Sequence, residues 1–235
     1  MTSQKNHEAL DVNEAIKQSE AFFVKYKKRL IAGAAIVLVV VGGVIAYIYG
    51  YSKPREDKAQ ELLGVVTQQF LINQDYEKAL KGEGKVAGLL TIIEKYSGTD
   101  AGNLARYEAG LCYYHQGKLK EAIAQLQEFD AQNDQTVSAQ ATAALANCYA
   151  GNKQLNEAVD AFKKAAKLTD VPALASEYLL QAGLILESQN KTDEALAIYQ
   201  QIKKDYPAAP LCSQQPQNGV VLDAMIDKYI ERTTK

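Results

Sequence analysis

A pattern of small and large apolar residues recurs three times in the second half of the chain and constrains its fold strongly. The segments that carry it are YEAGLCYYHQGKLKEAIAQLQEF, ALANCYAGNKQLNEAVDAFKKA and LQAGLILESQNKTDEALAIYQQI. When they are aligned, Gly110, Ala146 and Gly183 coincide, at spacings of 36 and 37 residues. A regular period of this length indicates a repeat architecture, in which each unit stacks on the next.

Within each repeat the pattern describes two helices joined by a polar turn. The other coinciding positions are a large residue (Tyr113, Tyr149, Leu186), a second small one (Ala122, Ala158, Ala195) and a bulky one (Leu126, Phe162, Tyr199). The turns read HQGKL, GNKQL and QNKTD. Because one hairpin cannot bury two apolar stripes, the hairpins are expected to stack into a solenoid.

This order of small, aromatic, small and bulky residues resembles the tetratricopeptide repeat (TPR) family, whose usual period is about 34 residues. The resemblance covers roughly residues 59–209. It implies an all-α helical solenoid that binds other proteins. The longer period predicts loops that are two or three residues longer than usual.

The units at the two ends are expected to be atypical, because a solenoid has to cover its apolar ends. Residues 53–102 hold a linker and a degenerate first repeat, whose second helix is broken by the glycines of LKGEGKVAG. Residues 103–209 hold three full units. Residues 210–235 hold a Pro/Gln-rich loop and then VVLDAMIDKYIERTTK, which is expected to form an amphipathic capping helix.

Upstream of the repeats, residues 30–51 contain no charged side chain, and half of them are Leu, Ile or Val. A membrane-spanning helix needs about 20 such residues. A cleaved signal peptide would have an apolar core of only about 7–15 residues and a small-residue exit site. We therefore predict a single N-terminal transmembrane helix, an uncleaved signal anchor, ahead of the TPR-type solenoid. Pro54 is expected to separate the two.

The charges beside the anchor predict its orientation. Four basic residues between positions 25 and 29 precede it without an acid, whereas the three that follow are mixed with Glu56 and Asp57. By the positive-inside rule, residues 1–29 form a cytoplasmic tail and the repeats lie outside. This predicts a single-pass protein of the bacterial inner membrane with a periplasmic C-terminal domain.

Gly42, Ala46 and Gly50 lie four residues apart within the anchor. Small residues at this spacing allow a second membrane helix to approach closely, so they form a predicted membrane-helix contact face. Glycine and alanine are common in membrane helices, and a chance spacing is the alternative.

The layout of tail, anchor and degenerate first repeat, with KYSGTDAGNLA before the first full unit, resembles a narrower group. It is the membrane-anchored TPR family that includes the ancillary subunit of the SecYEG translocon. That resemblance implies the SecYEG translocon and periplasmic chaperones as partners, with a role in protein secretion. Two alternatives stay open. One is a coordinator of cell-envelope assembly or cell division, and the other is a regulatory inhibitor whose cytoplasmic tail holds a response regulator.

In this family the first helix of each repeat lines a concave groove. The residues at matching positions, which form the predicted partner-binding groove, are Tyr107, Leu111, Tyr114, His115, Gln140, Asn147, Glu177, Leu180, Leu184 and Glu187. Such a surface suits an extended apolar peptide or a partner helix. Packing against neighbouring helices is the alternative role for the same side chains. A clamp for a C-terminal carboxylate is not expected, since leucines replace its polar residues at 111 and 184.

The sequence does not predict an enzyme, a cofactor, a metal site or a small-molecule substrate. GEGK at 82–85 lacks the spacing of a phosphate-binding loop. His115 has no constellation of His, Cys or carboxylate at metal-ligand spacing and is interpreted as a turn residue. The net charge of −2 does not indicate nucleic-acid binding, which usually leaves a basic footprint.

The three cysteines do not form an obvious disulfide framework. Cys112 and Cys148 occupy equivalent places in successive repeats. Helices that carry equivalent faces lie about 8–10 Å apart, whereas a disulfide needs Cα atoms within about 7 Å. We therefore interpret both as buried free thiols, with a disulfide as the alternative, and Cys212 has no evident partner. The sequence alone does not define their redox state.

Overall fold

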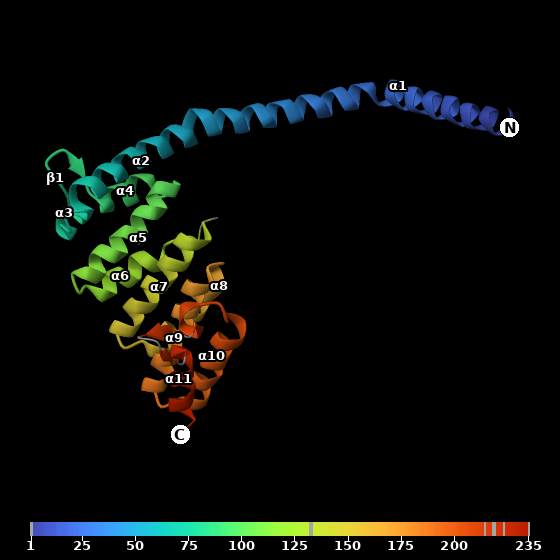
Figure 1. Cartoon of the computed structure of the whole chain (residues 1–235). Helices are drawn as coiled ribbons and strands as arrows, with labels where there is room; N and C mark the ends of the chain where they lie inside the picture. The colour runs from blue at the N-terminus through green and yellow to red at the C-terminus, as the bar shows by residue number, and fades with distance from the viewer. Residues whose placement is uncertain (1, 132–133, 214, 218–219, 223, 235) are drawn as a thin grey trace. The chain divides into compact units, whose positions relative to one another are not determined.

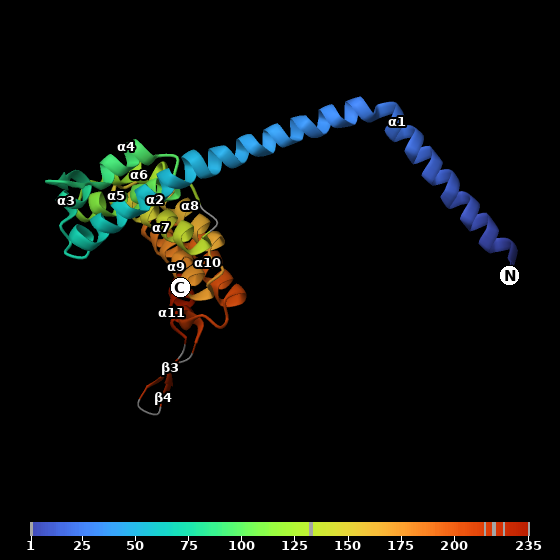
Figure 2. The ribbon, with the colours of Figure 1, turned by 90° about the horizontal axis from the view of Figure 1, so that it is seen from above.

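The computed structural model describes residues 2–131, 134–213, 215–217, 220–222 and 224–234. The chain divides into two compact units, Met1–Arg55 and Glu56–Lys235. The first unit is helical throughout its described residues, with α1 (Thr2–Tyr47) followed by the π-helical turn η1 (Ile48–Ser52). Helix α1 is visibly bent along its length (Figure 2).

A candidate membrane span begins in the first unit. The helix Val24–Leu71 is long and apolar enough to cross a membrane, and its most apolar stretch is 0% buried. Leu38 and Val39, for example, are 72% and 75% exposed. An uncovered apolar surface of this length is what a bilayer would cover.

Pro54 does not break this helix, contrary to the separation expected from the sequence. It is the second residue of α2 (Lys53–Val66), which follows η1 directly. In the π-helical turn the Lys53 N–H donates to the Ile48 carbonyl, one residue further back than in an α-helix. The wider turn accommodates a residue that has no N–H and whose ring would clash with the preceding turn of a regular α-helix.

The second unit is built from antiparallel helical hairpins (Figure 1). The three complete hairpins pair α5 (Asp100–His115) with α6 (Leu119–Gln127), α7 (Gln135–Gly151) with α8 (Leu155–Leu168), and α9 (Pro172–Ser188) with α10 (Thr192–Asp205). Each hairpin packs on the next through α6 against α7 and α8 against α9. Their buried apolar residues form successive clusters along the solenoid, and the partly buried Tyr113 and Tyr149 each pack against two of these clusters.

The small residue of each repeat lies where the two helices of a hairpin cross. A Cβ atom at Gly110 would lie 2.5 Å from Leu126 Cγ, and one at Gly183 would lie 2.3 Å from Tyr199 Cε1. In the middle hairpin Ala146 is fully buried in the same core cluster as Phe162. The aligned small and bulky positions of the sequence are therefore packing partners.

The hairpin turns share one backbone geometry. Gln74, Gly117, Lys153 and Asn190 have positive φ angles of 58°, 71°, 63° and 59°. In each turn this residue donates its N–H to the carbonyl three residues earlier, and the next residue donates to the carbonyl five residues earlier. These two bonds define the Schellman motif, which satisfies the unpaired carbonyls at a helix C-terminus.

The hairpin at the start of the solenoid is degenerate. Its first helix comprises α2 and the π-helical turn η2 (Thr67–Leu71). Its second helix is split into α3 (Tyr76–Lys81) and α4 (Leu89–Tyr96) by an antiparallel β-hairpin, β1 (Gly82–Glu83) with β2 (Val86–Ala87). Gly82 has φ +82°, and a Cβ there would lie 2.3 Å from the Val86 carbonyl oxygen, so the turn requires glycine.

The solenoid ends in a short capping helix. After the 3₁₀ turn η3 (Pro210–Cys212), strands β3 (Gln215–Gln217) and β4 (Val220–Leu222) pair antiparallel, and α11 (Met225–Thr233) follows. The capping helix was expected from Val220 but begins at Met225, because the β-branched residues at 220 and 221 favour extended backbone. Ile226 of α11 is fully buried in the core of the last hairpin.

Candidate peptide-binding pocket

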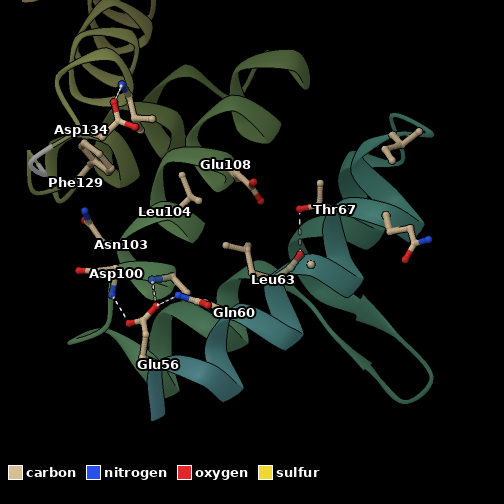
Figure 3. Close-up of a pocket in the computed structure, with 15 residues that line it drawn as sticks. Glu56, Gln60, Leu63, Thr67, Asp100, Asn103, Leu104, Glu108, Phe129 and Asp134 are labelled. Carbon is tan, nitrogen blue, oxygen red and sulfur yellow. Dashed lines mark hydrogen bonds between the residues drawn. The ribbon is translucent and has the colours of Figure 1, made fainter. Parts of the chain in front are cut away.

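A pocket of about 550 Å³ lies among the first helices of three successive hairpins. Residues of α2 and η2, of α5 and of the start of α7 line it, together with Phe129 (Figure 3). Its apolar wall is formed mainly by Leu63, Ile72, Leu104, Phe129 and Val137. This volume lies within the range of about 300–1,000 Å³ that is usual for binding sites.

Glu56 links α2 to the start of α5 at one edge of the pocket. Its Oε2 accepts a hydrogen bond from the Asp100 N–H at 2.7 Å, and its Oε1 accepts one from the Ala101 N–H at 3.0 Å. Gln60 donates to the same carboxylate at 3.0 Å. A carboxylate at this place satisfies free N–H groups and interacts favourably with the helix dipole.

Asn103 holds the connection between α6 and α7 against α5. Its Nδ2 donates to the Asp130 carbonyl at 2.7 Å, and its Oδ1 accepts from the Asp130 N–H at 2.9 Å. Asp134 then caps α7 by accepting from the N–H groups of Thr136 and Val137. These contacts position the wall of the pocket that Val137 forms, so side chains far apart in the sequence enclose one space.

The charge of the pocket is entirely acidic. Its lining includes the carboxylates of Glu56, Asp100, Glu108 and Asp134, and no Lys, Arg or His is among the described residues that line it. The Oε2 atom of Glu108 is buried and has no hydrogen-bond partner within the described chain. Burial raises the pKa of Glu108 from 4.5 to about 7, against a smaller lowering by the Thr67 hydroxyl.

The predicted groove residues of α5 lie beside this pocket and do not line it. Tyr107 is half-buried and packs against Phe129, with ring centroids 6.1 Å apart. Leu111 is also half-buried. At the end of the helix, His115 stacks on Tyr76 at 4.8 Å between ring centroids, and the exposed Tyr114 meets the His115 ring edge-on.

The predicted groove residues of α7 and α9 differ in exposure. Gln140, Asn147 and Glu177 are exposed on the surface. Leu180 is buried in the core with 4% exposure, and Leu184 packs against that core. Of these five side chains, the three polar ones are exposed, Leu184 is partly buried and Leu180 is buried.

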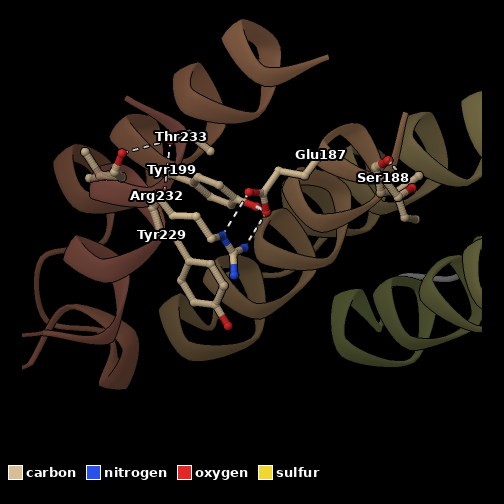
Figure 4. A network of polar contacts seen from close by, with 8 residues as sticks. Glu187, Ser188, Tyr199, Tyr229, Arg232 and Thr233 are labelled. Atoms are coloured by element: carbon tan, nitrogen blue, oxygen red, sulfur yellow. Dashed lines mark hydrogen bonds and ion pairs between the residues drawn. The ribbon is translucent and has the colours of Figure 1, made fainter. Parts of the chain in front are cut away.

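Glu187 is engaged by the capping helix (Figure 4). The Tyr199 hydroxyl donates to its Oε2 at 2.7 Å, and Arg232 of α11 donates through Nε to its Oε1 at 3.0 Å and through a guanidinium NH₂ to Oε2. The Arg232 guanidinium also lies 4.8 Å from the centroid of the Tyr229 ring. Burial and the bond to Glu187 raise the pKa of Tyr199. This network attaches α11 to the last hairpin.

Sequence reasoning missed the residues that line the pocket, although a signal for them exists. Leu104 and Glu108 lie on the same turns of α5 as the predicted Tyr107 and Leu111. Gly64, Gln68 and Ile72 occupy the corresponding first helix of the degenerate repeat. Applying the same groove positions to the degenerate repeat identifies first-helix residues at this end of the solenoid, where the pocket lies.

The anchor face and the cysteines complete the predicted set. A Cβ atom at Gly42 or Gly50 would meet nothing within 4 Å, so the small-residue face of the first unit is open. Cys112, Cys148 and Cys212 are free thiols in the structure. Burial raises the pKa of Cys112 to about 12 and that of Cys148 to about 11, which makes both thiols poor nucleophiles. Across the described residues, no group of three or more His, Cys, Asp or Glu is placed to hold a metal ion.

The fold and the comparisons with known proteins agree on the class of protein. Stacked hairpins with small residues at their crossings define a TPR-type solenoid, which is typically a non-catalytic scaffold for protein–protein interaction. Residues 20–215 match the family model described as tetratricopeptide repeat-like domain. The chain therefore belongs to the tetratricopeptide repeat-like family.

Two solved structures show the same fold at low sequence identity. One is a putative kinesin light chain with nearly identical TPR-like repeats from Podosopora anserina, with a TM-score of 0.54 and 12% identity over 76% of this chain and 86% of that chain. The other is a form of that same protein with a single substitution, with a TM-score of 0.53 and 14% identity over 76% of this chain and 85% of that chain. No curated protein sequence matches the chain.

Proposed function

We propose that this protein is a membrane-anchored TPR scaffold that binds other proteins through the pocket among α2, α5 and α7. The main support is the pocket itself, because a largely apolar space of about 550 Å³ between first helices offers a partner segment a place to bury side chains. The uncovered apolar helix of the first unit supports the anchor. The exposed Gln140, Asn147 and Glu177 extend the proposed binding face along the solenoid.

The finer part of the proposal is a role beside the SecYEG translocon, at the periplasmic face of a bacterial inner membrane. It is supported by the four basic residues, with no acid among them, on one side of the anchor and by the layout of tail, anchor and degenerate repeat. In this role the solenoid hands secreted chains to periplasmic chaperones. The open face of Gly42, Ala46 and Gly50 is proposed to contact a translocon helix.

The decisive experiment is affinity purification of the full chain from membranes in mild detergent, with mass spectrometry of the proteins that accompany it. The variant Leu104→Gln places an amide in the apolar wall of the pocket. Met225→Gln is the matched control, because Met225 is exposed and lies outside the pocket. Circular dichroism of both variants checks that the solenoid remains folded.

We expect translocon subunits and chaperones with the unmodified chain and the control, and loss of the chaperones from Leu104→Gln. Recovery of wall-synthesis or outer-membrane assembly proteins instead would replace the translocon role with that of an envelope coordinator. Partners that are retained equally by all three chains would show that the pocket does not bind them.

Topology is tested separately with alkaline phosphatase, which folds only outside the cytoplasm. A fusion to the C-terminus of the full chain should be active. A fusion after residue 24, ahead of the anchor, should be inactive. The reverse pattern would overturn the orientation, and two inactive fusions would overturn the anchor.

A further inference from the structure

Glu108 lies at the edge of an apolar space, and none of the described residues that line this space supplies a counter-ion. Its Oε2 is buried and has no hydrogen-bond partner within the described chain. In Figure 3 the side chain points from α5 towards Thr67 of η2. The Thr67 hydroxyl donates to the Leu63 carbonyl at 3.0 Å, and its lowering effect on the pKa of Glu108 is smaller than the raising effect of burial. A buried carboxylate oxygen that lacks a hydrogen-bond donor favours a ligand that brings one.

We propose that the pocket selects a partner segment in which one lysine or arginine is flanked by apolar residues, and that Glu108 pairs with the cationic group. This inference rests on the proposed function, since it names the chemistry of the segment that the scaffold binds. The apolar residues that flank the lysine or arginine in the partner segment would pack against the wall formed by Leu63, Leu104 and Val137.

Charge complementarity points to a cation. The titratable groups that face the pocket are Glu56 from α2, Asp100 and Glu108 from α5, and Asp134 from the N-cap of α7, and all four are acids. The other elements packed on α5, namely α3, α4 and α6, contribute no charged residue to the described lining. On α5 itself Cys112 lies one turn beyond Glu108 and remains a neutral thiol. The positive charge therefore has to come from the ligand.

Two other kinds of ligand fit less well. A metal ion needs several ligands around one point, and the described residues contain no group of three or more His, Cys, Asp or Glu that could provide them. An acidic or phosphorylated segment would be repelled by the four carboxylates. A lysine or arginine side chain combines an apolar stem, which suits the wall, with a charge that suits Glu108.

The pairing predicts that binding depends on pH. In the free pocket burial raises the pKa of Glu108 to about 7. A bound cation favours the ionised carboxylate, so it lowers this pKa and binding releases a proton below pH 7. The affinity should therefore be highest above pH 7. It should fall by about tenfold at pH 5.5, where Glu108 of the free pocket is mostly protonated and the advantage of the cation is lost.

The test uses the full chain in lipid nanodiscs and three matched sets of ten-residue apolar peptides. Each peptide carries one Trp as a fluorescent reporter, because the protein contains no Trp. The central residue is lysine in the first set, norleucine in the second and glutamate in the third, and the flanking apolar residues vary in the same way in each set. Affinities are measured at pH 8 and pH 5.5 for the unmodified chain, Glu108→Gln and Glu94→Gln. Glu94 is an exposed acid of α4 outside the pocket, so it controls for net charge.

We expect the best lysine peptides to bind about tenfold more tightly than their norleucine counterparts at pH 8. This preference should disappear at pH 5.5 and in Glu108→Gln, and it should persist in Glu94→Gln. Equal binding of lysine and norleucine peptides, or a lysine preference that survives in Glu108→Gln, would overturn the inference.

The two proposals can fail separately. If none of the peptides binds while partner proteins still co-purify with the unmodified chain, the inference fails and the scaffold function stands. If the lysine peptides bind as expected and no partner protein co-purifies, the scaffold function fails instead. Circular dichroism of Glu108→Gln, which is isosteric with the native side chain, confirms that any loss of binding is not a loss of fold.

Discussion

The carboxylate of Glu56 accepts a hydrogen bond from the backbone N–H of Asp100 at 2.7 Å, across 44 residues of sequence. A second bond from the Ala101 N–H makes Glu56 a cap for α5 that is supplied by a different helix. The cap joins the degenerate first hairpin to the first complete one at the edge of the proposed pocket. It therefore contributes to both the stability of the solenoid and the shape of the site.

We predict that Glu56→Ala lowers the free energy of unfolding by about 1 kcal/mol, because two N–H groups at the start of α5 lose their acceptor. Urea unfolding of the full chain in detergent, followed by far-UV circular dichroism, measures the change. Asp57→Ala is the control, since Asp57 is exposed next to Glu56, and it should have little effect. Equal stability of the two variants would contradict the capping role.

The crossing of α5 and α6 gives a second prediction. A Cβ atom at Gly110 would lie 2.5 Å from Leu126 Cγ, so Gly110→Ala has to displace a buried leucine. We expect it to destabilise the solenoid by about 1–2 kcal/mol. Gly64→Ala in α2 meets nothing within 4 Å and should be neutral or stabilising by up to about 1 kcal/mol, through helix propensity. Unfolding curves of the two variants make the comparison.

A double-mutant cycle isolates the contact. In a Leu126→Ala background, Gly110→Ala should cost much less, because the clashing side chain is gone. If Gly110→Ala were as destabilising there as in the unmodified chain, the cost would arise elsewhere in the hairpin.

Much of the solenoid follows from its sequence because the information is local and repeated. The alignment of Gly110 with Ala146 and Gly183 predicts which residues cross, and the structure confirms this at Leu126 and Tyr199. The sequence also predicts the helical hairpins and the break in the second helix of the first repeat, and the structure contains both.

The features that were missed depend on long-range contacts. The pocket needs Glu56, Asn103 and Asp130 to bring three hairpins together, and none of these residues carries a motif of its own. Glu187 occupies a groove position in the repeat register, but it forms a salt bridge with Arg232 of α11. The periodicity of the sequence does not predict where a capping helix packs. The predicted helix break at Pro54 is wrong because a π-helical turn accommodates the proline, and the sequence pattern does not show such a turn.

The shared turn geometry gives a third prediction. Lys153 adopts φ 63° in the Schellman motif after α7, where the equivalent residue after α5 is Gly117. A residue with a Cβ atom destabilises the folded state by roughly 1–2 kcal/mol when its backbone is left-handed, and glycine avoids this cost. Glycine also increases the conformational entropy of the unfolded chain, which offsets part of the stabilisation. Lys153→Gly should therefore stabilise the protein by about 0.5–1 kcal/mol, as measured by thermal unfolding. Lys153→Ala keeps the Cβ and should change little, so stabilisation by both substitutions would point to the lysine charge instead.

The capping helix provides a fourth prediction. Arg232 donates to both oxygens of Glu187, which also accepts from the buried Tyr199. Arg232→Ala should speed amide hydrogen exchange selectively in α11, because the free energy of opening this helix decreases by about 1 kcal/mol. The effect is modest because the arginine is partly exposed and solvent screens the ion pair. Lys228→Ala, an exposed residue of the same helix, is the control. Unchanged exchange in α11 would show that apolar contacts alone hold the helix.

Glu108 makes the stability of the empty pocket depend on pH. Its pKa is about 7 in the folded chain, where the side chain is buried, and 4.5 without that burial. Between these values the folded state binds more protons than the unfolded state, so the free energy of unfolding decreases as pH rises. A pKa shift of this size lowers the free energy of unfolding by up to about 3 kcal/mol. The full decrease is reached above pH 7, and there is no decrease below about pH 4.5.

The variant Glu108→Gln removes this titration and tests it directly. Gln is neutral at every pH and has the same shape, so the variant should be more stable than the unmodified chain at pH 8 and similar to it at pH 4.5. Unfolding curves at several pH values within this window give the difference between the two proteins, while Glu94→Gln should follow the unmodified chain throughout. A constant difference across the window would mean that Glu108 titrates as an ordinary exposed carboxylate, and the pH dependence proposed for binding would lose its basis.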